Sequence, residues 1–297
     1  MMTDSTLLSL HDVQLVYRAL PALRNMSWQP RMDQQWACLG PNGAGKTSLA
    51  NILSGQASHF SGDYYRSDRL REKGVAYVCF EQARALCERD RKLDDSETRA
   101  DATAPGPLVQ VLILGKQALD EGFLYWVERL GIDHILQRGL RYISTGEMRK
   151  TLLIKAILSD PGLLILDSPL DGLDAGSQRE LSQVIDELLR SEVNVLMLCR
   201  QLEDLPPGIT HVLVMENGTT LAQGERDAIL ARADVIALMQ PPAEPLAELP
   251  APNPRPSDIP TGAPLLALQD VNVSYGNLHV LKDVHWRFDR GQHCYVS

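Results

Sequence analysis

The chain has 297 residues, enough for one large or two moderate domains with a substantial core. It carries 38 acidic and 29 basic residues without any basic block, which disfavours nucleic acid as a primary partner. Its five cysteines are scattered without a C-x-x-C pair, so a disulfide framework and a zinc site are not indicated and a reducing cytoplasm is expected. The N-terminus does not resemble a signal peptide, and no apolar run reaches the length of about 18 residues that spans a membrane. Any membrane-spanning part is therefore expected in another subunit.

The first motif along the chain fits the phosphate-loop pattern G-x-x-x-x-G-K-[ST]. Its residues are Gly40, Pro41, Asn42, Gly43, Ala44, Gly45, Lys46 and Thr47. An apolar run over 36–39 precedes it and a helical segment over 48–53 follows it, as phosphate binding at a helix N-terminus requires. We expect Lys46 to pair with the β- and γ-phosphates and the Thr47 hydroxyl to ligate Mg²⁺. The motif predicts that the chain binds a nucleoside triphosphate.

Short apolar runs further along predict buried strands over 75–80, 163–166 and 193–199, with helical patterns between or after them. Residues 84–107 are polar and charged, whereas 108–158 show the apolar spacing of a helical insertion. An Asn217-Gly218 pair between apolar segments predicts a hairpin over 210–223. The pattern is typical of an α/β fold with a largely parallel sheet and some antiparallel strands.

Asp167 is predicted to be a second protein ligand of Mg²⁺, in addition to Thr47. It ends the apolar run over 163–166, where a strand would bring its carboxylate to the mouth of the sheet beside the phosphate loop. The alternative is an aspartate that only caps the turn before Pro169.

The chain also contains an internal repeat. Residues 7–13 (LLSLHDV) return as residues 265–271 (LLALQDV), and Tyr17, Leu23 and Trp28 recur at the same offset as Tyr275, Leu281 and Trp286. The counterpart of Gly40 would be position 298, so we expect only the N-terminal stub of a second domain over 265–297. Half of the 18 prolines lie in 241–264, which predicts an extended linker after a first domain over 1–240.

In their order along residues 7–240, these motifs resemble those of the ATP-binding-cassette (ABC) ATPases. The resemblance implies a P-loop fold of that type, ATP as the nucleotide and Mg²⁺ as its metal. It also implies that Tyr17 stacks on adenine and that Gln82 senses Mg²⁺ and the attacking water. For Tyr17, simple packing at a strand end is the alternative.

Residues 144–148 (STGEM) resemble the family's signature motif, which implies that Ser144 and Gly146 contact the γ-phosphate of ATP held by an opposing domain. The same residues also form a plausible helix cap. Residues 171–174 (DGLD) resemble the loop that couples the two domains, with Asp174 at the family's aspartate.

Several positions depart from the family pattern. Thr145 stands where the family's signature motif has its first glycine, and Ile143 stands where the motif usually has leucine. A β-branched residue such as Thr145 restricts the backbone more than glycine does, which hinders close approach of the backbone to a phosphate. Ser168 stands where the family has its catalytic glutamate, and a serine hydroxyl is a poor base near neutral pH. Arg200 stands where the family has a histidine that touches the γ-phosphate, and it either stabilises phosphate charge or is an ordinary strand-end arginine. The expected site holds ATP and hydrolyses it slowly.

The chain also shows a finer resemblance to the paired-cassette subgroup associated with molybdate transport and photorepair. This resemblance lies in residues 138–149, residues 80–82 and the DGLD loop. It implies a cytoplasmic protein, free or peripheral at the inner face of the cell membrane. The expected partners are a second ABC domain, in the same full-length chain or in a homodimer, and membrane permease subunits. Three functions remain open: the ATPase of a molybdate-type importer, a non-transport regulatory or repair ATPase, and an inactive truncated fragment.

Overall fold

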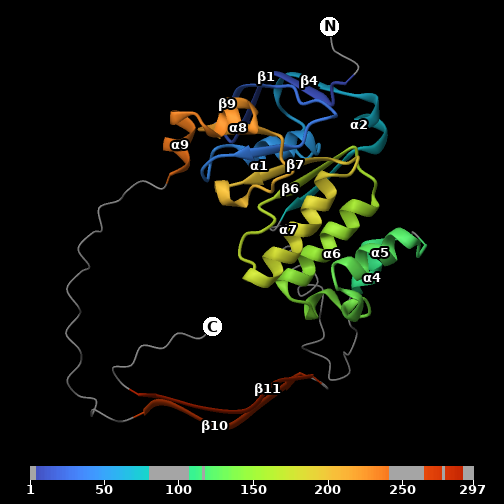
Figure 1. Ribbon diagram of the computed structural model, residues 1–297, viewed down its shortest axis with the longest axis vertical. Coiled ribbons are helices and arrows are strands. Elements are labelled where there is room, and N and C mark those ends of the chain that lie inside the picture. Colours follow the sequence, from blue (N-terminus) through green and yellow to red (C-terminus); the bar gives the residue numbers. More distant parts are fainter. Residues whose placement is uncertain (1–4, 80–106, 116–117, 241–263, 276–277, 290–297) are drawn as a thin grey trace, which may run out of the picture. The chain divides into compact units, whose positions relative to one another are not determined.

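The computed structural model describes residues 5–79, 107–115, 118–240, 264–275 and 278–289. It divides into two units, Met1–Pro241 and Pro242–Ser297, which are described separately (Figure 1). Gln82, the polar stretch over 84–106 and the proline-rich residues 241–263 lie outside the described residues. None of the helices in the described ranges has the length and apolarity needed to cross a membrane.

A six-stranded sheet forms the centre of the first unit, in the order β5-β6-β7-β3-β8-β9. Its strands are β3 (Trp36–Leu39), β5 (Val75–Cys79), β6 (Leu163–Asp167), β7 (Asn194–Cys199), β8 (His211–Glu216) and β9 (Thr219–Glu225). The first five strands in the sheet order are parallel, and β9 pairs antiparallel with β8. The predicted hairpin is present, and its turn residues Asn217 and Gly218 both have positive φ, as a two-residue hairpin turn requires. The α/β fold with a largely parallel sheet is confirmed.

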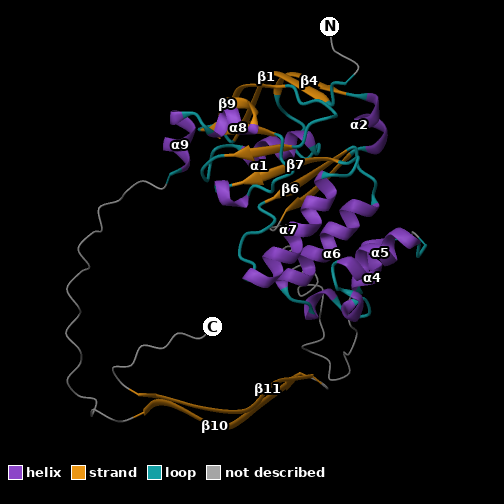
Figure 2. Cartoon of the chain, in the orientation of Figure 1, coloured by secondary structure: helices purple, strands orange, loops and turns teal. Residues whose placement is uncertain are grey.

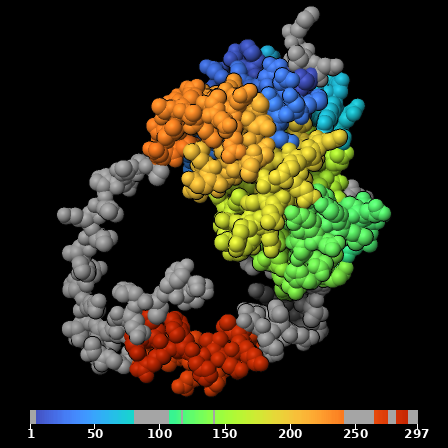
Figure 3. Space-filling view, viewed as in Figure 1, coloured from blue at the N-terminus to red at the C-terminus, as the bar shows by residue number. Residues whose placement is uncertain are grey.

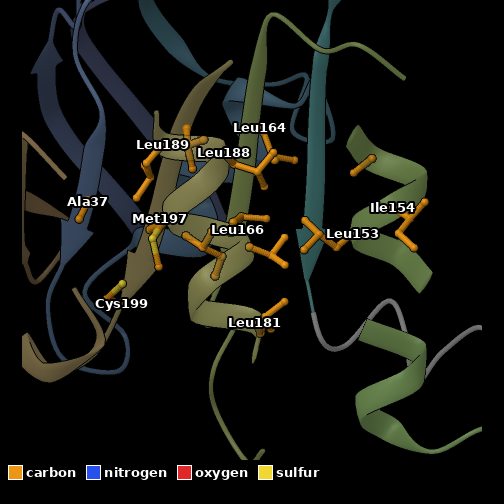
Figure 4. Packing of buried hydrophobic residues seen from close by; sticks show 14 of the residues in the cluster. Ala37, Leu153, Ile154, Leu164, Leu166, Leu181, Leu188, Leu189, Met197 and Cys199 are labelled. Atoms are coloured by element: carbon orange, nitrogen blue, oxygen red, sulfur yellow. The ribbon is translucent and has the colours of Figure 1, made fainter. Parts of the chain in front are cut away.

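One face of this sheet is covered by helices. α6 (Thr145–Leu158) and α7 (Ala175–Leu189) pack their apolar sides on β6 and β7, as Leu153, Leu181 and Met197 illustrate in Figure 4. The helical insertion predicted over 108–158 comprises α4 (Val109–Leu114), α5 (Glu121–Arg129), two 3₁₀ turns (Asp133–Ile135 and Leu140–Tyr142) and α6. After β7 the described residues also form a 3₁₀ turn (Leu202–Asp204), α8 (Arg226–Leu230) and α9 (Ala233–Met239).

The opposite face carries α1 (Lys46–Leu53) and a three-stranded antiparallel sheet in the order β2-β1-β4 (Figure 2). Its strands are β1 (Leu8–Tyr17), β2 (Leu20–Trp28) and β4 (Ser61–Arg66), followed by α2 (Asp68–Lys73). β9 lies against β2, and the Arg24 amide donates to the Gly218 carbonyl at 2.8 Å. In Figure 3 the orange C-terminal part of this unit accordingly lies beside its blue N-terminal part. α1 shares one buried cluster with residues of both sheets, whereas residues 41–43 of the phosphate loop are exposed.

The described residues of the second unit form a hairpin of β10 (Pro264–Tyr275) and β11 (Leu278–Asp289). This hairpin reproduces the pairing of the β1–β2 hairpin. In β1–β2, Leu10 pairs with Trp28 and Val13 pairs with Met26. The residues at the same positions of the repeat form the pairs Leu268–Trp286 and Val271–Val284 in β10–β11. Asp12 and its counterpart Asp270 both have positive φ, at 49° and 51°. The sequence repeat is therefore also a repeat of strand register.

Candidate functional site

The phosphate loop connects the buried strand β3 to α1, and its glycines are required by geometry. Gly40 and Gly45 have φ of +155° and +101°, in the region that favours glycine. A Cβ on Gly40 would lie 2.3 Å from the Met215 carbonyl oxygen, and one on Gly45 would lie 2.9 Å from the Ala22 carbonyl oxygen. Around Gly43, by contrast, no atom of the described residues beyond its chain neighbours lies within 4 Å of the Cβ position. The loop is thus packed tightly on its inner side and open on the side where a ligand would lie.

Lys46, the first residue of α1, is a buried cation at the open side of this loop. Its side chain is folded back so that Nζ donates to the carbonyl oxygens of Gly40 (2.6 Å) and Pro41 (3.0 Å). Burial lowers the pKa of Lys46, and the neighbouring Asp167 carboxylate offsets part of that effect. An anion bound in the loop would therefore stabilise the charged form of Lys46.

Asp167 ends β6 beside the loop, and three hydroxyl groups converge on its carboxylate. Oδ2 accepts hydrogen bonds from Tyr77 Oη at 2.8 Å and from Thr47 Oγ1 at 3.3 Å, while Ser168 Oγ donates to Oδ1 at 3.4 Å. Burial raises the pKa of Tyr77, so the tyrosine hydroxyl keeps its proton and donates a hydrogen bond to the Asp167 carboxylate. Hydroxyl and carboxylate oxygens are the hard ligands that Mg²⁺ prefers. The donor set of Thr47 and Asp167 therefore fits this ion.

No preformed metal cluster of three or more His, Cys, Asp or Glu side chains occurs among the residues that the structure describes. A cation held by Thr47 and Asp167 alone would need ligands from elsewhere. Mg²⁺ typically obtains them from the phosphates of a bound nucleotide and from water.

A cavity of about 310 Å³ opens over the loop. It is lined by Ala22, residues 42–48, Asp167, Ser168, Asp171 and Arg200. Arg200, which follows β7, forms an ion pair with Asp171, with Nε 3.3 Å from Oδ2. The structure thus brings Lys46, Thr47, Asp167, Ser168 and Arg200, predicted from separate parts of the sequence, to one cavity.

Among the described residues, Tyr17, Ser144, Gly146 and Asp174 do not line this cavity. Ser144 caps α6, accepting a hydrogen bond from the Glu147 amide while the Glu147 carboxylate accepts one from the Ser144 amide. Gly146 lies in the first turn of the same helix. Tyr17 ends β1 with 44% of its surface exposed. The helix-cap role considered for the STGE sequence is therefore realised by Ser144.

Asp174 caps α7. Its Oδ1 accepts hydrogen bonds from the amides of Gly176 (2.9 Å) and Ser177 (3.0 Å), and its Oδ2 accepts one from Ser177 Oγ (2.6 Å). The Ser177 hydroxyl, together with these amides, lowers the pKa of Asp174. The charged carboxylate is thus fixed at the N-terminus of α7, where it is favourable.

Sequence reasoning gave no role to Tyr77 or Arg149, and it included Asp171 only as the first residue of the DGLD loop. Arg149 on α6 is buried, and its guanidinium donates to the Pro169 carbonyl at 2.9 Å and to the Asp171 carbonyl. It therefore links the helix that begins at Ser144 to the loop that follows Asp167. The available signals were a tyrosine within an apolar strand and an arginine in the helical segment that follows the STGE sequence.

Relatives with this architecture are numerous. ModF of Escherichia coli K12, an ABC transporter ATP-binding protein, is 28% identical over 265 residues, which are 88% of this chain and 53% of ModF. The zinc import ATP-binding protein ZnuC of Pseudomonas aeruginosa UCBPP-PA14 is 30% identical over 67% of each chain. The molybdenum import ATP-binding protein ModC of Haemophilus influenzae is 32% identical over 63% of this chain and 52% of ModC. The chain thus spans about half the length of ModF.

The fold is that of solved ABC structures. A nucleotide-free ATP-binding cassette from an ABC transporter superposes with a TM-score of 0.62 at 18% identity, covering 78% of this chain and 98% of the cassette. The family model described as ABC transporter matches residues 23–171, which is half of the chain and includes the phosphate loop, the capped helix α6 and Asp167. The chain therefore belongs to the ABC transporter family and carries that family's ATP-binding domain.

Proposed function

We propose that residues 1–240 bind ATP together with Mg²⁺ and hydrolyse it slowly. The observation that carries this proposal is the cavity that the phosphate loop shares with Asp167, in which the buried Lys46 donates, among the described residues, to backbone carbonyls alone. Loop residues 40–47 would hold the phosphates, and Thr47 and Asp167 would hold the metal, with Gln82 as the family's third contact. Mg²⁺ would neutralise charge on the β- and γ-phosphates.

Slow hydrolysis is supported by the side chains where the family has its catalytic pair. The Ser168 hydroxyl, which donates to Asp167 Oδ1 at 3.4 Å, is a far weaker base than the carboxylate of a glutamate. The Arg200 guanidinium has hydrogen-bond donors and no acceptor, and it is paired with Asp171. Neither Ser168 nor Arg200 replaces a general base, and the cavity retains its binding groups.

The binding proposal predicts that Lys46→Ala weakens ATP affinity by roughly 10- to 100-fold, because a hydrogen bond to a charged group contributes about 1.5–3 kcal/mol. Isothermal titration calorimetry with Mg·ATP would measure this change. Lys73→Ala is the matched control, since Lys73 pairs with Asp160 on the surface away from the cavity. Equal affinity of the Lys46→Ala variant and the wild type would refute the proposal.

We propose a second cassette domain as the partner of residues 1–240, since ABC domains commonly function in pairs. The proposed organisation is a linker over 241–264 and the beginning of a second cassette over 265–297, supported by the shared strand register of β1–β2 and β10–β11. In a homodimer, Ser144 and Gly146 of each copy would face the ATP of the other, while Tyr17 would stack on the adenine of its own.

For residues 1–240 in the absence of another cassette, we predict a nucleotide-dependent homodimer. Sedimentation velocity over a series of protein concentrations, with and without Mg·ATP, would detect it. Lys46→Ala serves as the control that should stay monomeric. A wild-type monomer at saturating Mg·ATP would instead indicate that the partner must be the complete second cassette.

We propose molybdate as the cargo of the system to which this domain belongs, with permease subunits as further partners at the inner face of the membrane. The support is the name of ModC and the sequence resemblance to the paired-cassette subgroup; ZnuC, with comparable identity, is named for zinc. Deleting the gene and measuring cellular molybdenum and zinc by mass spectrometry would test the assignment. Unchanged contents of both metals would favour the second candidate, a non-transport regulatory or repair ATPase.

A further inference from the structure

Tyr77 is a polar side chain within an otherwise apolar strand next to the metal-ligand candidate Asp167. In the parallel pairing of β5 with β6, Tyr77 lies opposite Ile165, and Cys79 lies opposite Asp167. Side chains lean along the strand direction, which allows a long tyrosine to reach a residue two positions further on. Its hydroxyl accordingly meets Asp167 Oδ2 at 2.8 Å.

This contact is the shortest of the three hydroxyl contacts to the Asp167 carboxylate. The Thr47 contact is 3.3 Å and the Ser168 contact is 3.4 Å, both long for a hydrogen bond between a hydroxyl and a carboxylate. Thr47 is itself a candidate ligand, so its hydroxyl oxygen would turn to the metal. The tyrosine is therefore the group best placed to keep the carboxylate oriented once a metal binds.

We infer that Tyr77 is a positioning residue for Mg²⁺: its hydroxyl fixes the Asp167 carboxylate in the orientation that the nucleotide-bound ion requires. The inference rests on the proposed function of the site. The Tyr77 hydroxyl donates to Asp167 Oδ2, so it would act on the metal through this carboxylate and not as a ligand. Partners that orient a metal-ligating side chain typically contribute about 10- to 100-fold to metal affinity when they are removed.

The test is Tyr77→Phe, which removes one oxygen and leaves the aromatic ring that packs at the edge of the core. ATP affinity would be measured by calorimetry in excess EDTA and across a Mg²⁺ titration, and Mn²⁺ binding to the nucleotide complex would be followed by electron paramagnetic resonance. We expect an unchanged affinity in EDTA and a roughly tenfold higher metal concentration at half effect. Tyr64→Phe is the matched control, because this half-buried tyrosine donates to the Leu53 carbonyl instead.

A double-mutant cycle with Asp167→Ala separates positioning from packing. If Tyr77 acts through the carboxylate, Tyr77→Phe should change the metal dependence in the wild-type background and leave it unchanged in the Asp167→Ala background. The inference is overturned if Tyr77→Phe has the metal dependence of the wild type, or if its affinity falls equally in EDTA and in Mg²⁺. A wild-type protein that binds no nucleotide, or binds it without any effect of metal, would overturn the proposed function and this inference with it.

Discussion

The clearest test of the altered catalytic positions is to restore the family's residues with Ser168→Glu and Arg200→His. Ser168 has φ of +47°, so this position already bears the conformational cost of a left-handed residue. Because glutamate and serine both carry a Cβ, the exchange adds no backbone penalty of that kind. The new carboxylate would project into the cavity of about 310 Å³ that holds Lys46 and Arg200.

The two changes are expected to act together. With Arg200 in place, a glutamate at position 168 has a guanidinium in the same cavity with which to pair, and a paired carboxylate is a weaker base. Replacing Arg200 removes that cation and breaks its ion pair with Asp171. Both partners of this pair are more than a third exposed, so its loss alters stability by less than about 1 kcal/mol. We therefore expect the double variant to exceed Ser168→Glu alone.

A positioned general base typically contributes about 10²- to 10⁴-fold to the rate. The gain requires that water and phosphorus be aligned first, which depends on closure against an opposing signature segment. The assay is steady-state phosphate release by the wild type, both single variants and the double variant, at protein concentrations where dimers are seen. Failure of the double variant to exceed the wild type in a confirmed dimer would refute the assignment and shift attention to Thr145.

Two further predictions concern the scaffold. Gly45→Ala should weaken ATP binding and lower the free energy of unfolding more than Gly55→Ala does. A Cβ at Gly45 would lie 2.9 Å from the Ala22 carbonyl oxygen, whereas none of the described atoms beyond its chain neighbours lies within 4 Å of a Cβ at Gly55. Gly55→Ala should cost only about 1–2 kcal/mol for its positive φ, as measured by urea unfolding, and equal losses would contradict the steric argument. Burial lowers the pKa of His211 below that of the unfolded chain, so its contribution to stability is present above about pH 6.5 and is lost as the pH falls. As the pH falls below about 6.5, the free energy of unfolding of His211→Gln should therefore decrease less steeply than that of the wild type. An equally steep decrease in both proteins would contradict this prediction.

The sequence predicted the parts of the fold that depend on local pattern. The strand before the phosphate loop, the strand ending at Asp167 and the Asn217-Gly218 hairpin all have signals within a few residues, and the structure has them as β3, β6 and β8–β9. The α/β class follows from the alternation of these strands with helical segments. Boundaries shifted slightly, because α1 begins at Lys46, directly after the left-handed Gly45, instead of at residue 48.

The contacts that define the site were beyond prediction because they join distant segments. Tyr77 meets Asp167 only because β5 is the sheet neighbour of β6, and these residues are 90 positions apart. Arg149 reaches the Pro169 carbonyl only because α6 packs over the end of β6. No periodicity within one segment specifies which strands are adjacent, so these partners required the assembled sheet.

Relative to the family pattern, the residues at positions 168 and 200 both make the charge of the cavity more positive. A serine in place of glutamate at position 168 removes a negative charge, and an arginine in place of a neutral histidine at position 200 adds a positive one. Asp171 compensates for part of this change by pairing with Arg200. A triphosphate entering the cavity would compete with Asp171 for the guanidinium, and a guanidinium paired with phosphate would favour its retention. Under the proposed function, stronger retention of phosphate together with the loss of a base would favour a domain that stays closed on ATP, because both changes would slow the step that releases the nucleotide.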